Sequence, residues 1–247
     1  MRRKKKYRNS RRKSQFRYIK MLVAVLTMTG VGFVVKGAMN GDVSSEVVEP
    51  KSVNAVKADE VEVDDDRELI VIDPGHGGID PGSVVDGIYE KDVNLEVALK
   101  LQAALEEEGY SVMITRNDDE SLSLLERTEF ANEVGAELFI SLHQNSYGED
   151  TSVNGIEVYY NNREKSVESE EIAQLIQDGL ITETGAKDRG IRAYNELVVT
   201  RETTMPSCLI EMGYMSNPTE LALMNSDSYQ DKMVTGIVNG INQFFEY

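Results

Sequence analysis

From residue 69 onward, short apolar runs alternate along the chain with longer amphipathic stretches. The short runs are rich in β-branched residues and end at turn-forming or polar residues, which is the pattern of buried strands. The longer stretches repeat apolar residues every three or four positions, as a helix with one buried face does. We expect strands at 69–73, 111–116, 137–142, 156–160 and 207–211, helices at 91–108, 123–134, 168–184 and 229–245, and a short helix that begins at Asn217 and Pro218.

Strands that alternate with helices favour an α/β fold, in which helices cover both faces of a mainly parallel, mixed sheet. We therefore predict a single α/β domain over residues 68–247 and expect it to be monomeric. In such sheets the ligand crevice lies beyond the carboxyl ends of the strands. Residues that follow the predicted strands are accordingly the first candidates for function.

The first 67 residues have a different composition from the rest. Residues 1–20 hold eleven Lys or Arg and no acid, and residues 21–35 carry no charge and are mostly apolar. This order is typical of a secretory signal peptide or a signal anchor, which we expect at 21–36, with 1–20 as a basic cytoplasmic head. Residues 37–67 are acidic and lack aromatics, and predict a disordered, flexible stem. The domain would then lie outside the cytoplasm, in the cell envelope, either anchored to the membrane through residues 21–35 or secreted.

The charge of the chain excludes nucleic acid as a partner. The chain has 26 basic and 43 acidic residues, and eleven of the basic ones lie in residues 1–20. The other 227 residues therefore hold 15 basic and 43 acidic residues, a net charge of −28 that repels a polyanion. The single cysteine, Cys208, allows no intramolecular disulfide and fits a buried strand position.

Both histidines of the chain follow apolar strand patterns. His76 comes after the strand at 69–73 in a turn rich in glycine, and His143 directly follows the strand at 137–142. Both can therefore meet at the carboxyl edge of one sheet, although two unrelated loop histidines remain the alternative. A zinc site would need a third ligand, commonly a carboxylate, and an open position for water. Three carboxylates qualify by their place in the sequence: Glu90, Asp73 and Asp80.

Glu211 ends the apolar strand at 207–211. A charged group at the end of a buried strand costs free energy unless it is paired. It is therefore either a paired structural carboxylate or a functional one. A metal-dependent hydrolase needs a carboxylate near the metal that takes a proton from the attacking water, and Glu211 is our candidate.

Five separated motifs occur in one order along the chain. They are IDPGHGGIDPG at 72–82, EK at 90–91, SLHQN at 141–145, KDRGI at 187–191 and MPSCLIEMGYMSN at 205–217. In this order they resemble the zinc-dependent N-acetylmuramoyl-L-alanine amidases of the amidase type 3 family. The resemblance covers essentially all of residues 68–247.

The resemblance implies one Zn2+ held by His76, Glu90 and His143, with Glu211 as the catalytic glutamate. It also implies the reaction, which is cleavage of the amide that joins the lactyl group of N-acetylmuramic acid to L-alanine in peptidoglycan. Asp73 is then better placed to support a zinc ligand than to bind the ion itself.

Asn145 and Arg189 lie inside matched motifs and are our candidates for substrate contact. The chain departs from the family at Gln144, where alanine is usual, and we expect this change to alter local packing without touching a ligand. Some family members carry an inserted helix that blocks the zinc site. The segment from Gln144 to Arg189 is short and shows no spare helix, which predicts an open site.

Two other functions compete with the amidase. One is a non-catalytic peptidoglycan-binding scaffold on the same fold, which would have lost at least one of the four polar residues; none is missing. The other is a zinc peptidase that acts elsewhere on the stem peptide. Two histidines and one glutamate do not by themselves exclude this peptidase.

Overall fold

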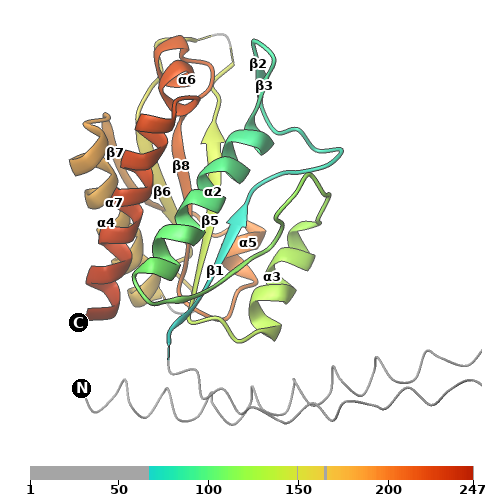
Figure 1. Ribbon diagram of the computed structural model, residues 1–247, viewed down its shortest axis with the longest axis vertical. Coiled ribbons are helices and arrows are strands. Elements are labelled where there is room, and N and C mark those ends of the chain that lie inside the picture. The colour runs from blue at the N-terminus through green and yellow to red at the C-terminus, as the bar shows by residue number, and fades with distance from the viewer. Residues whose placement is uncertain (1–66, 149, 164–165, 247) are drawn as a thin grey trace, which may run out of the picture. The chain divides into compact units, whose positions relative to one another are not determined.

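A computed structural model describes residues 67–148, 150–163 and 166–246, which form an α/β domain around one six-stranded sheet (Figure 1). The strand order is β4-β1-β5-β8-β6-β7. The strands are β1 Leu69–Pro74, β4 Ser111–Ile114, β5 Leu138–Asn145, β6 Ile156–Tyr160, β7 Asp188–Ala193 and β8 Ser207–Tyr214. β4, β1, β5 and β8 are parallel to one another, whereas β6 pairs with β8 in antiparallel fashion and with β7 in parallel fashion. The prediction of a mixed, mainly parallel α/β domain is confirmed.

Helices cover both faces of the sheet because the central strands are apolar on both sides. In β1, Ile70 and Ile72 belong to one buried cluster and Val71 to the other, since successive side chains point to opposite faces. The larger cluster includes α2 Glu90–Glu107, α4 Ser166–Thr184 and α7 Asp227–Glu246. The smaller one includes α3 Leu124–Glu133 and α5 Val198–Arg201, and α6 Pro218–Met224 connects β8 to α7.

Two strands continue past their predicted ends. β5 extends to Asn145 and β8 to Tyr214, so His143 and Glu211 lie within strands that hold them rigidly. The sequence did not predict β7, or the short hairpin of β2 Val84–Val85 and β3 Ile88–Tyr89, or α5. β7 lies at the edge of the sheet and is only partly buried, so its sequence lacks the apolar run that marks the central strands.

Among the described residues, no helix has the length and apolar character needed to cross a membrane. The predicted head, membrane segment at 21–36 and stem lie outside the residues that the structure describes.

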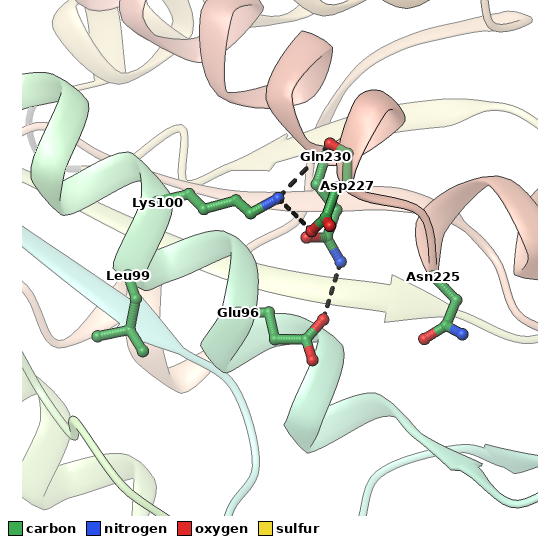
Figure 2. A pocket seen from close by; sticks show the side chains of 6 residues that line it. All are labelled: Glu96, Leu99, Lys100, Asn225, Asp227 and Gln230. Atoms are coloured by element: carbon green, nitrogen blue, oxygen red, sulfur yellow. Dashed lines mark hydrogen bonds and ion pairs between the residues drawn. The ribbon is translucent and has the colours of Figure 1, made fainter.

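A hollow of about 430 Å³ lies between α2 and the beginning of α7 (Figure 2). Lys100 Nζ crosses from α2 to Asp227 Oδ1 at 2.9 Å and to Asp231 Oδ1 at 3.0 Å. Gln230 Nε2 donates a hydrogen bond to Glu96 Oε2 at 3.0 Å. These polar pairs tie the C-terminal helix to α2, the helix whose first residue belongs to the candidate site described below.

Helices α4 and α7 approach each other closely at two glycines. A Cβ atom on Gly179 would lie 2.2 Å from the carbonyl oxygen of Gly236, and one on Gly236 would lie 2.8 Å from the backbone of Gly179. Both distances are too short for a side chain, so this crossing depends on glycine in each helix.

We expect Gly236→Ala to lower the free energy of unfolding by about 1–3 kcal/mol, because the new methyl group would push α7 away from α4. The loss should occur although alanine favours helix by about 1 kcal/mol over glycine. Urea denaturation measures it. Lys232→Ala, on the exposed face of α7, is the matched control and should stay within about 0.5 kcal/mol of wild type. A Gly236→Ala protein as stable as wild type would contradict the close packing.

Candidate metal centre

Three adjacent parallel strands bring the candidate residues to one edge of the sheet. His76 follows the end of β1 by two residues, and His143 lies near the end of β5. Glu211 lies in β8 directly opposite His143 in the strand pairing. The two histidines therefore meet at the carboxyl edge, and their ring centroids are 4.9 Å apart.

Glu90, the first residue of α2, lies between the two imidazoles. Its Oε1 atom is 3.1 Å from His76 Nε2 and 3.1 Å from His143 Nδ1. One ligand atom from each of the three residues lies within 4.8 Å of the others, close enough for a single metal ion. Of the three carboxylates left open by the sequence, Glu90 is the one that completes this cluster in the described part of the chain.

Backbone and amide groups hold the Glu90 carboxylate in place. The backbone N–H of Gln144 donates to Oε1 at 3.0 Å, the N–H of Ser83 donates to Oε2 at 2.9 Å, and Asn94 Nδ2 donates to Oε1 at 3.4 Å. Burial raises the pKa of Glu90, but the hydrogen bonds and charges of His143 and His76 lower it well below its usual range. Glu90 is therefore ionised at neutral pH, as a metal ligand must be.

Gln144 lies closer to the ligands than the sequence indicated. Besides the backbone hydrogen bond to Glu90, its side-chain Nε2 donates to Asn94 Oδ1 at 3.3 Å, and Asn94 in turn contacts Glu90. The contact with Glu90 comes from the backbone N–H, which alanine would also supply, whereas the glutamine side chain itself reaches Asn94.

Asp80 orients His76 from the side away from Glu90. His76 Nδ1 lies 2.8 Å from Asp80 Oδ2, which leaves Nε2 facing Glu90. Burial lowers the pKa of His76, but Glu90 and Asp80 together raise it to about 9. Asp80, a possible third ligand by sequence, therefore acts in this structure on the opposite nitrogen of the ring.

Asp73 supports the loop that carries His76. Its carboxylate accepts hydrogen bonds from Thr115 Oγ1 at 2.6 Å, Ser141 Oγ at 2.8 Å and Arg127 Nη1 at 2.7 Å. Arg127 Nη2 also donates to the His76 carbonyl at 2.7 Å. Among the described residues Asp73 thus reaches the ligand through Arg127 and the backbone, rather than through the imidazole.

His76 needs this support because its φ of 62° lies in the left-handed region, which is uncommon for a residue with a side chain. Arg116 adds hydrogen bonds to the carbonyls of Pro74 and Gly75, each at 3.0 Å. The sequence alone pointed to neither Arg116 nor Arg127. Nothing in the neighbouring sequence marks either arginine as buried, because an arginine in a helix or after a strand has the same sequence pattern whether it is buried or exposed.

Glu211 has a buried oxygen with no partner. Its Oε2 atom is buried and accepts no hydrogen bond within the described residues. The pKa of Glu211 is raised to about 7, chiefly by burial. The charges of Glu90 and Glu157 also raise this pKa, whereas the charge of His143 lowers it. An unpaired buried carboxylate is costly to keep for structure alone, so this environment favours the functional interpretation.

An open groove of about 770 Å³ begins at Glu211 and is lined by side chains from several elements: Asn145, Tyr159, Arg192, Ala193, Tyr194, Leu197 and Glu211. Asn145, a predicted substrate contact, is among these lining residues. Arg189 is not among the lining residues; its guanidinium lies 5.0 Å from the Tyr214 ring centroid and 3.4 Å from Glu157. Glu157, which the sequence analysis missed, is buried and directly opposite Glu211 in the strand pairing.

The residues present fit a zinc ion. Two imidazoles and one carboxylate form a common ligand set for catalytic zinc, and they converge here beside an unpaired acid. Between Asn145 and Arg189, the described residues contain one helix, α4, which packs on the sheet and on α7. Within those residues, no inserted helix lies across the cluster.

Comparisons with known proteins identify the family to which the chain belongs. Residues 70–243 match the family of N-acetylmuramoyl-L-alanine amidases. The germination-specific N-acetylmuramoyl-L-alanine amidase of Bacillus subtilis is 34% identical over 192 residues, which cover 72% of this chain and 80% of that protein. The crystal structure of an N-acetylmuramoyl-L-alanine amidase from Clostridium difficile 630 is 36% identical with a TM-score of 0.70, over 73% of this chain and 97% of the other. The catalytic domain of CwlV from Bacillus (Paenibacillus) polymyxa var. colistinus is 38% identical with a TM-score of 0.68, over 72% and 98%. The chain therefore belongs to the N-acetylmuramoyl-L-alanine amidases of the amidase type 3 family.

Proposed function

We propose that this amidase cleaves the bond between N-acetylmuramic acid and L-alanine in peptidoglycan with one Zn2+ held by His76, Glu90 and His143. Glu211 is the general base. One observation carries the proposal: the three potential ligands converge within 4.8 Å, and Glu211, which has a buried oxygen without a hydrogen-bond partner, lies opposite His143 on the adjacent strand β8.

The metal ion and Glu211 have different roles in the proposed reaction. A bound zinc ion polarises the amide carbonyl and makes water more acidic. Glu211 accepts the proton of the attacking water and passes it to the nitrogen of L-alanine as the carbon–nitrogen bond breaks. A pKa of about 7 suits a group that must take up and then release a proton near neutral pH.

A cell-wall substrate requires the domain at 68–247 to lie outside the cytoplasm. We propose that residues 21–36 are the signal peptide or signal anchor that takes it there, with 1–20 as the cytoplasmic head and 37–67 as the stem. The basic-then-apolar order of residues 1–35 supports this assignment.

Digestion of purified peptidoglycan tests the reaction. The protein should release stem peptides with a free L-alanine amino terminus, detected by mass analysis of the soluble fragments. A chelator should abolish the release and added Zn2+ should restore it, because the proposed chemistry needs the ion. Fragments cut within the stem peptide would indicate a peptidase instead, and zinc binding without any cleavage would indicate a scaffold.

Glu211→Gln should retain zinc and lose turnover. Glutamine fills the same space but cannot take the proton of the attacking water, so we expect kcat to fall by about 10²–10⁴-fold. Metal content by atomic emission and initial rates on peptidoglycan measure the two effects separately. A variant with near wild-type turnover would remove Glu211 from its role as base.

Asp80→Asn should weaken zinc binding by about 10–100-fold, because Asp80 holds the His76 ring in its binding orientation. Competition with a chromogenic chelator measures the affinity. Asp86→Asn is the matched control, since Asp86 is an exposed aspartate in the nearby turn between β2 and β3. Equal affinities for the two variants would show that Asp80 does not orient a ligand.

A further inference from the structure

Arg192 places a positive charge in the groove that begins at Glu211. It belongs to β7 at the edge of the sheet, and half of its side chain is exposed, at 50%. It lines the groove together with Tyr159 and Tyr194, whose ring centroids are 6.1 Å apart. The proposed chemistry gives this guanidinium no task.

Buried Glu157 fixes the position of Arg192. Glu157 Oε2 pairs with Arg192 Nε at 2.6 Å, while Oε1 accepts from Tyr214 Oη at 2.6 Å and from Asn145 Nδ2 at 3.1 Å. Arg189 also pairs with Oε1, at 3.4 Å. One carboxylate thus faces two guanidinium groups, so Glu157 by itself neutralises only one of them.

Of the two guanidinium groups, that of Arg192 lies on the groove side of this cluster. Arg189 is mostly buried, with 22% of its side chain exposed, whereas Arg192 lines the groove. The Arg192 atom that lies against Glu157 is Nε, and the guanidinium carries four further N–H bonds on its two Nη groups. A guanidinium held in this way suits a planar acceptor such as a carboxylate.

The substrate has carboxylates on one side only of the bond to be cleaved. The glycan of N-acetylated amino sugars is neutral, whereas the stem peptide carries free carboxyl groups. The first of these is the α-carboxyl of the second residue, which wall peptides present either free or as a carboxamide. An anion-binding group in the groove therefore faces the peptide side.

The spacing of the strands agrees with this assignment. Arg192 lies opposite Tyr159 in β6, and Tyr159 lies opposite Leu209, two residues before Glu211 in β8. β7 is two strands away from β8, or about 10 Å at the usual strand spacing. The α-carboxyl of the second residue lies within about 7 Å of the cleaved bond in an extended peptide, and the arginine side chain covers the rest of the distance.

We propose that Arg192 binds the free α-carboxylate of the second stem-peptide residue and so selects that form of peptidoglycan over the carboxamide form. Glu157 is the positioning residue that aims the guanidinium. This inference rests on the proposed function and adds a substrate preference to it.

The test compares two substrates that differ in one group. Glycan strands carry the same stem peptide with either a carboxylate or a carboxamide on the second residue, and release of the peptide gives kcat/KM for each. The full-length wild-type protein should prefer the carboxylate by about tenfold or more.

Arg192→Gln should reduce the preference to about threefold or less, with little change in kcat/KM on the carboxamide substrate. Arg192→Lys keeps a charge and should keep part of the preference. Arg163→Gln, an exposed arginine outside the groove lining, should behave as wild type.

Equal rates of the wild-type protein on both substrates, or a preference for the carboxamide, would overturn this inference and leave the amidase reaction standing. An equal loss on both substrates in Arg192→Gln would also overturn it, because it would show a structural role only. A wild-type protein that released stem peptide from neither substrate would overturn the proposed function, and this inference with it.

Discussion

The ionised carboxylate of Glu90, buried between two imidazoles, is the constraint on which the site depends. A buried charge is tolerated only when its surroundings satisfy it, and here His76, His143, Ser83 and Gln144 all do so. These partners come from the loop after β1, from β5 and from the loop before the β2–β3 hairpin, so the start of α2 must be held against all of them. The side chains of the hollow between α2 and α7 contribute by tying α2 to the C-terminal helix (Figure 2).

The loop after β1 shows how backbone support serves a ligand. His76 has a left-handed conformation, and the free energy that this costs is offset by hydrogen bonds to its own carbonyl and ring. Arg127 reaches the carbonyl and is held by Asp73, while Asp80 holds the ring. Two aspartates of one motif therefore support the same histidine from different sides, one through the backbone and one through the imidazole.

The change of strand direction at β6 places different residues at the two ends of the groove, with Glu211 of β8 at one end and Arg192 of β7 at the other. β1, β5 and β8 are parallel and deliver His76, His143 and Glu211 to one edge, as the rule for parallel sheets predicts. The antiparallel β6 then sets Glu157 opposite Glu211, and the ion pair of Glu157 with Arg192 holds that guanidinium in the groove lining. The proposed general base in β8 and the proposed peptide-binding Arg192 in β7 are thus two strands apart in one sheet.

The sequence by itself determined the elements with strong apolar periodicity, the α/β class, and the placement of both histidines and Glu211 on or just after strands. These properties are local, because the periodicity of apolar residues within a short window of the sequence indicates a buried strand or a helix face. It did not choose among Glu90, Asp73 and Asp80 without the family resemblance, and it showed neither Arg127 nor Glu157 nor the edge strand β7. Only the tertiary structure decided these points. Which carboxylate reaches both imidazoles, and which arginine lies against which acid, depends on distances between segments far apart in the chain, for which a single sequence has no periodic signal.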